Sequence, residues 1–108
     1  MANWVVEVLN ETVQAVLDAL PEDIRARLVR LSRLIGQQGL EYVREPYVKH
    51  LTGKLWEMRL KGKDGIARAL YVTALGRRVV IVRAFVKKTQ KTPDSEIDLA
   101  QRRAKEVV

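Results

Sequence analysis

The chain has 108 residues, of which 47% are hydrophobic, and a formal net charge of +7. This hydrophobic content excludes a disordered chain, and the length fits a single domain, residues 1–108, with one modest core. The chain has no cysteine and one histidine, which excludes a disulfide framework and argues against a dedicated zinc site. We therefore expect no metal and no cofactor.

The hydrophobic segments are short. No apolar run approaches the roughly 18 residues that a membrane span needs. Glu7 interrupts the first apolar segment, WVVEVL, and no basic region precedes it, which argues against a signal peptide. We expect no membrane span and a cytoplasmic protein.

The first third of the chain predicts a strand followed by two helices. Residues 4–9 are largely β-branched, which is typical of a strand, and Asn10 is placed to cap the next helix. Pro21 starts a second helix, which residues 36–39 (GQQG) end. The apolar positions at helical spacing are Val13, Val16, Leu17 and Leu20, then Ile24, Leu28, Leu31 and Ile35. We expect a helical hairpin on one face of a sheet.

Arginines occupy the other faces of the second predicted helix. They are Arg25, Arg27, Arg30 and Arg33. This pattern favours a solvated face, with a secondary contact to an anion as the alternative.

In residues 40–53 the apolar residues recur at neither helical nor strand spacing, so we expect an irregular connection. It contains the only histidine, His50. We interpret His50 as a surface residue, unless this loop folds back over the basic sheet.

Three strands are predicted in succession after residue 54. In residues 55–61 (LWEMRLK) apolar and charged residues alternate, and in residues 66–73 (IARALYVT) Arg68 is in phase with large apolar residues. Burying a lone guanidinium is costly. Arg68 therefore either faces a cleft near the end of the sheet, which we favour, or pairs with a carboxylate such as Glu57.

The third of these strands is apolar on both faces. Val79, Ile81 and Phe85 alternate with Val80, Val82 and Ala84. This pattern indicates an interior strand that is covered on both sides. The C-terminal segment is the candidate cover, because Thr92 can cap a helix in which Pro93 takes the first position. The predicted fold is α+β, in the order β-α-α-β-β-β-α, with a mostly antiparallel sheet packed by the helical hairpin and the C-terminal helix.

The positive charge is concentrated in residues 54–91. This stretch contains eleven lysines and arginines against two acidic residues, whereas the segments on either side are slightly acidic. We predict a localised basic patch on the sheet, and such a patch favours a polyanionic partner.

Residues 85–93, FVKKTQKTP, form the most unusual local sequence. They place lysines, hydroxyls and an amide between an interior strand and a helix start, which suits RNA binding. The candidate RNA contacts are the charges of Lys87, Lys88 and Lys91, the hydrogen-bonding groups of Thr89 and Gln90, and the rings of Phe85 or Tyr71 as stacking partners for an unpaired base. The alternative is that Phe85 lies in the core and the lysines only solvate a strand end.

The chain lacks a histidine pair, a carboxylate pair, a Walker loop and a dinucleotide-binding glycine pattern. Phosphoryl transfer by electrostatics remains feasible, because RNA supplies its own nucleophile, the 2′-hydroxyl next to the scissile phosphate. A protein that aligns this hydroxyl and surrounds the phosphorane with arginine and lysine lowers the barrier without a metal. One such donor contributes on the order of 3 kcal/mol.

Three segments carry a resemblance to a known family: residues 56–61 (WEMRLK), 65–71 (GIARALY) and 84–93 (AFVKKTQKTP). Together they resemble the phage-derived branch of the RelE/HigB toxin superfamily, and the last segment is the specific part. The resemblance implies a RelE-like fold and a toxin of a type II toxin–antitoxin module. Such a toxin is an endoribonuclease (mRNA interferase) that cleaves mRNA on the ribosome and leaves a 2′,3′-cyclic phosphate. The implied partner is a cognate antitoxin, often of helix-turn-helix type, in a toxin–antitoxin hetero-oligomer.

The resemblance also implies roles for single residues. Arg59 and Arg68 match strand arginines that line the family's RNA cleft, and Lys87 stands where other members place a basic residue. These three are the implied catalytic residues: Arg68 and Lys87 hold the scissile phosphate, while Arg59, with Lys88 and Lys91, holds the flanking backbone. Some relatives use a tyrosine near the C-terminus as general base, and this chain has none after Pro93. Tyr71, a lysine with a lowered pKa or a ribosomal group would have to replace it.

Two other functions stay open. A ParE-like toxin would poison DNA gyrase without nuclease activity, and would leave transcripts intact while DNA breaks accumulate. A non-catalytic nucleic-acid-binding module would bind in a salt-sensitive way without cleaving RNA in the presence of ribosomes.

Overall fold

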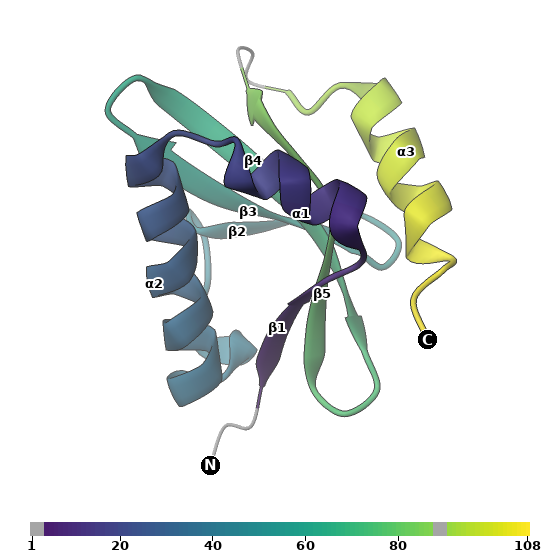
Figure 1. Cartoon of the computed structure of the whole chain (residues 1–108). Coiled ribbons are helices and arrows are strands. Elements are labelled where there is room, and N and C mark those ends of the chain that lie inside the picture. Colours follow the sequence, from purple (N-terminus) through teal and green to yellow (C-terminus); the bar gives the residue numbers. More distant parts are fainter. Residues whose placement is uncertain (1–3, 88–90) are drawn as a thin grey trace.

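The computed structural model describes residues 4–87 and 91–108; the side chain of Lys87 also lies outside this description. Three α-helices, a short 3-10 helix and five strands make up the described part (Figure 1). In chain order the elements are β1 (Val5–Val8), α1 (Glu11–Asp18), α2 (Glu22–Gln38), η1 (Leu40–Tyr42), β2 (Val48–Thr52), β3 (Leu55–Gly62), β4 (Gly65–Ala74), β5 (Arg78–Lys87) and α3 (Asp94–Ala104). No helix in the described ranges is long and apolar enough to cross a membrane.

The strands form one sheet in the order β1-β5-β4-β3-β2. β1 runs parallel to β5, and the other neighbouring pairs are antiparallel. The predicted α+β class and mostly antiparallel sheet are confirmed, whereas the predicted order β-α-α-β-β-β-α lacks one strand, β2. The interior position of β5, inferred from its two apolar faces, is confirmed as well.

The prediction of an irregular connection over residues 40–53 is wrong in its second half, because β2 forms there. β2 is an edge strand that pairs only with β3, with Val48 opposite Met58 and Lys49 opposite Glu57. Only Val48 is buried in this strand, and its pairing shifts register between His50 and Thr52. An edge strand with little burial and an irregular register shows no alternating pattern, which is why the sequence did not reveal it.

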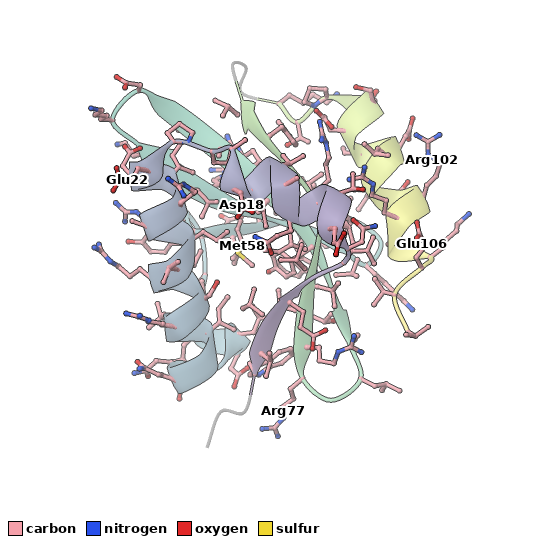
Figure 2. All side chains as sticks on the ribbon, viewed as in Figure 1. Asp18, Glu22, Met58, Arg77, Arg102 and Glu106 are labelled. Carbon is pink, nitrogen blue, oxygen red and sulfur yellow. The ribbon has the colours of Figure 1, made fainter. Side chains whose placement is uncertain are left out.

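The two faces of the sheet are covered by different helices (Figure 1). α1 and α2 cover one face, where Met58 lies between the sheet and these helices (Figure 2). As predicted, the side chain of Asn10 caps α1, accepting a 3.0 Å hydrogen bond from the amide of Val13. α3 covers the other face, over a second core cluster formed by Leu55, Leu70, Val72, Val80, Val82 and Ala100. The C-terminal segment is therefore the second cover, as expected.

A β-bulge in β5 changes which side chains meet α3. Leu70 pairs with Arg83, and Tyr71 pairs with Ile81, so Val82 is an extra residue on β5. The strict alternation predicted for this strand is wrong after the bulge. Ala84 belongs to the α1–α2 side, and Phe85 packs on the α3 side.

Polar contacts also fasten α3 to β5. Glu96 accepts hydrogen bonds of 2.7 and 3.2 Å from the guanidinium of Arg83, and Arg103 donates to the backbone carbonyl of Val82 at 2.9 Å. The helix begins at Asp94, after Pro93, with no side-chain cap. The predicted capping role of Thr92 is wrong because its hydroxyl binds elsewhere.

Candidate functional site

A buried carboxylate joins three parts of the fold. Glu57, on β3, faces α3 and is 1% exposed. Its Oε2 accepts a 2.9 Å hydrogen bond from Nη1 of Arg68 on β4 and lies 3.4 Å from Nε of Arg59. Its Oε1 accepts a 2.7 Å hydrogen bond from the hydroxyl of Thr92, just before α3. Both carboxylate oxygens are therefore satisfied, as a buried charge requires.

Arg59 and Arg68 lie directly opposite each other on neighbouring strands. Two like charges in this relationship repel. Glu57 sits two residues before Arg59 on the same face and contacts both guanidinium groups. The carboxylate therefore offsets the repulsion and allows two arginines to occupy one site.

Arg68 is buried, with 5% of its surface exposed. Burial lowers the pKa of its guanidinium, while the Glu57 carboxylate raises this pKa and Arg59 lowers it. The favoured prediction, an Arg68 that faces an open cleft, is wrong; the alternative, a carboxylate pair with Glu57, is what the structure contains. Its Nε is buried and has no hydrogen-bond partner among the described residues.

An open cleft lies above this pair, between α3 and the β2–β3 edge of the sheet. It has a volume of about 420 Å³. The lining residues are Lys49, His50 and Leu51 of β2, Glu57 and Arg59 of β3, and Lys91, Thr92 and Ile97 at the start of α3. The Arg59 side chain is 32% exposed here. We call it the first anion-binding cleft, after the role that we propose for it. Its three cationic side chains are Lys49, Arg59 and Lys91, and they lie over the Glu57 carboxylate that two arginines contact.

Part of the predicted lysine string can be placed. Lys91 lines the first anion-binding cleft. β5 ends at Lys87, whose side chain lies outside the described residues, and so do Lys88, Thr89 and Gln90.

The two aromatic candidates lie on opposite sides of the sheet. Tyr71 is 1% exposed and packs on the α1–α2 side, away from Glu57, and burial raises the pKa of its hydroxyl. There it can neither stack on a base in the cleft nor accept a proton from RNA, which corrects its assignment. Phe85 is half-buried on the α3 side, opposite Arg68, and 6.0 Å separates its ring centroid from Cζ of Arg83.

Three arginines of the predicted basic patch pair with acidic residues, so less of its positive charge is unpaired than the sequence count indicates. Glu57, Glu96 and Glu7 pair with Arg68, Arg83 and Arg78 respectively. Two of these acids lie outside residues 54–91. The sequence count missed them because the partners come together only through β1–β5 pairing and the docking of α3.

Sequence reasoning also missed Lys49 and His50 as cleft residues. Both belong to β2, the strand that the sequence did not predict. The ring of His50 meets that of Trp56 edge-on at 5.0 Å, and its Nε2 lies 2.7 Å from the carbonyl oxygen of Gly53. A carbonyl only accepts, so Nε2 donates in this contact. Trp56 lies opposite Tyr71, so the His50 ring is on the α1–α2 side of the sheet, away from Glu57.

Comparison with protein families places the sequence in one of them. Residues 15–105 match the family described as "Phage derived protein Gp49-like (DUF891)". The chain belongs to the phage-derived Gp49-like family. The matched part of this Gp49-like protein includes every residue that lines the first anion-binding cleft. None of the curated proteins matches the sequence significantly.

A solved structure shares the fold. The Gp49-like protein is similar to a chain in the crystal structure of the archaeal RelE–RelB complex from Pyrococcus horikoshii OT3, with a TM-score of 0.57 and 20% sequence identity. The similarity covers 80% of this chain and 97% of that chain. At this identity the likeness shows a common RelE-like architecture.

Proposed function

We propose that this Gp49-like protein is the toxin of a type II toxin–antitoxin module and cleaves mRNA on the ribosome without a metal ion. The observation that carries the proposal is the first anion-binding cleft, where Lys49, Arg59 and Lys91 surround the Glu57–Arg68 pair. The structural similarity to a chain of a RelE–RelB complex supports the same function.

In the proposed reaction the 2′-hydroxyl oxygen attacks the adjacent phosphorus and the bond to the 5′-oxygen breaks. The products are a 2′,3′-cyclic phosphate and, after protonation, a 5′-hydroxyl. Arg59 is the proposed catalytic cation, because its guanidinium is partly exposed and its 3.4 Å contact with Glu57 is long for a hydrogen bond. Its remaining N–H groups can therefore bind the phosphorane oxygens as negative charge develops.

Glu57 and Arg68 are proposed to position this cation. Arg68 binds the same oxygen of Glu57 that Arg59 approaches. Glu57 and Arg68 are both buried. Arg68 therefore acts through Glu57, and also adds positive charge beneath the phosphate in a site of low dielectric. The catalytic role predicted for Arg68 becomes, in this proposal, a positioning and electrostatic one.

The lysines are proposed to hold the RNA backbone. Lys49 and Lys91 reach the cleft from its two sides, β2 and the segment before α3. Lys87 remains a predicted phosphate contact. Lys88, Thr89 and Gln90 remain predicted contacts to the flanking RNA, and Phe85 a predicted stacking partner.

The general base is proposed to be a lysine of the cleft or a ribosomal group. The ring of His50 contacts that of Trp56 edge-on, and Trp56 lies opposite Tyr71, so this ring is on the α1–α2 side of the sheet, away from Glu57. His50→Ala should therefore cleave mRNA at the wild-type rate. A loss of about 100-fold would show that His50 takes part in the reaction.

The proposed partner is a cognate antitoxin. The structural neighbour was solved as a RelE–RelB complex, and a cation-lined cleft beside a sheet edge suits an acidic segment that covers it. The antitoxin is predicted to be of helix-turn-helix type, and the purified pair should not cleave mRNA.

The proposal is tested by primer extension on a reporter mRNA after brief induction of the wild type and of Arg59→Ala. We expect discrete cuts in frame with translation for the wild type and none for the variant. Arg33→Ala, which removes an exposed arginine of α2, is the matched control and should cut like the wild type. Growth arrest without any cuts would reject the nuclease and select the gyrase-poisoning alternative.

A further inference from the structure

A second cleft lies under the C-terminal half of α3. It has a volume of about 570 Å³. The lining residues are Thr52, Lys54 and Leu55 at the β2–β3 turn, Val72 of β4, and Asp98, Gln101, Arg102, Ala104 and Lys105 at α3. We call it the second anion-binding cleft, since three of its side chains are cationic and one is acidic.

The cations converge from two separate elements. Lys54 comes from the turn between β2 and β3, whereas Arg102 is in the last turn of α3 and Lys105 directly follows this helix. A preference of cations for a helix C-terminus explains the last two but not Lys54. All three are exposed, and Figure 2 shows Arg102 on the side of α3 that points away from α1 and α2.

These cations also lack ion-pair partners within the described part of the chain. Neither Lys54, Arg102 nor Lys105 forms an ion pair with another described residue. Arg83 and Arg103, which face the sheet, instead bind Glu96 and the Val82 carbonyl. The fold thus uses two arginines to dock α3 and leaves three cations around an open cleft with polar Thr52 and Gln101 beside them.

The two clefts are adjacent along the same pair of elements. The first includes Leu51 and Ile97, and the second includes the next residue on each element, Thr52 and Asp98. Both clefts therefore lie next to each other between α3 and the β2–β3 edge. The eleven residues of α3 span about 16 Å at 1.5 Å per residue. The cations of the two clefts are therefore spread along the helix and do not form a single cluster.

We propose that the second anion-binding cleft binds the backbone of single-stranded RNA that continues from the scissile phosphate in the first. The inference rests on the proposed function and extends it to a substrate track along α3. A cationic groove that follows a strand is how proteins hold single-stranded nucleic acid without reading its sequence. Lys54, Arg102 and Lys105 contact phosphates, and Thr52 and Gln101 donate hydrogen bonds to phosphate or ribose oxygens.

The test measures binding and cleavage on the same proteins. The probe is a fluorescein-labelled oligouridylate with 2′-O-methyl riboses, which cannot be cleaved, and anisotropy gives its affinity over a range of KCl concentrations. The variant is Arg102→Gln/Lys105→Gln. The control is Arg30→Gln/Arg33→Gln, which removes the same charge from exposed positions of α2.

Each phosphate contact contributes about 0.7 to the slope of log affinity against log salt for a single strand. We therefore expect the variant to lower this slope by about 1.4 and to slow mRNA cleavage on ribosomes, while the control does neither. If the variant matches the control in both measurements while Arg59→Ala still abolishes cleavage, the track is wrong and the proposed function stands. The track is equally wrong if the variant loses only binding of an acidic antitoxin. If the wild type neither binds the probe nor cleaves mRNA on ribosomes, both proposals are overturned.

Discussion

The hydroxyl of Thr92 donates a 2.7 Å hydrogen bond to the buried carboxylate of Glu57. This contact joins residues 35 positions apart and fastens the segment that carries Lys91 to the strand that carries Arg59. Two of the cations that we assign to the RNA phosphates, Arg59 and Lys91, are therefore held relative to each other through one carboxylate. A short buried hydrogen bond to a charged group is among the stronger ones in proteins.

Thr92→Val should lower both stability and cleavage. Valine keeps the shape but leaves Oε1 of Glu57 without this donor, which costs about 1–3 kcal/mol of unfolding free energy. Urea unfolding measures the first effect and primer extension the second. Thr92→Ser should restore both, and Thr73→Val, at an exposed position of β4, should change neither. Full cleavage by Thr92→Val would show that the contact does not position the site.

Glu57→Gln should be strongly destabilising. It removes the carboxylate that offsets the charges of Arg59 and Arg68, and breaking a buried pair in this way costs about 3–5 kcal/mol. The double variant Glu57→Gln/Arg68→Met should regain much of this stability, because no buried guanidinium remains unpaired. It should not regain cleavage. Thermal unfolding of the three proteins tests this, and equal stability of wild type and Glu57→Gln would contradict the buried pair.

Tyr71→Phe should cleave mRNA at the wild-type rate. The ring lies on the α1–α2 side of the sheet, and burial raises the pKa of the hydroxyl, so this group is poorly suited to accept a proton. Single-turnover cleavage on ribosomes is the measurement. A loss of about 100-fold would mean that Tyr71 reaches the substrate through a rearrangement of the sheet.

Asp23 should contribute stability that disappears in acid. Its Oδ2 accepts a 2.7 Å hydrogen bond from the Lys63 amide, and this bond, followed by that from Ile24, lowers the pKa of the carboxyl despite some desolvation. Because the folded pKa lies below the unfolded one, the contribution is complete above the unfolded value and is lost as pH falls through the folded value. The difference in unfolding midpoint between wild type and Asp23→Asn should therefore be constant near neutrality and shrink below about pH 4. A difference that persists unchanged at lower pH would refute the assignment.

Local patterns in the sequence determined most of the elements. Asn10 and the stripe of α2 report contacts within one or two helical turns, so they could be recognised without the fold. The apolar residues on both faces of β5 indicated an interior strand, because such a strand must be buried on each side whatever its neighbours are. Pro93 likewise marked the start of α3, which begins one residue later than predicted, at Asp94.

Only the tertiary structure decided how the site is assembled. Thr92 looked like a helix cap, yet its hydroxyl binds Glu57, and Arg68 is buried with that same carboxylate. Phe85 lies on the α3 side because Val82 is an extra residue in β5. β2 places Lys49 in the cleft although the sequence of this strand shows no alternation. Periodicity and capping report which side chains are buried near one another along the chain. The partner of a buried charge, and the register of an edge strand, depend instead on how distant strands and helices pack, and a single sequence does not encode that arrangement locally.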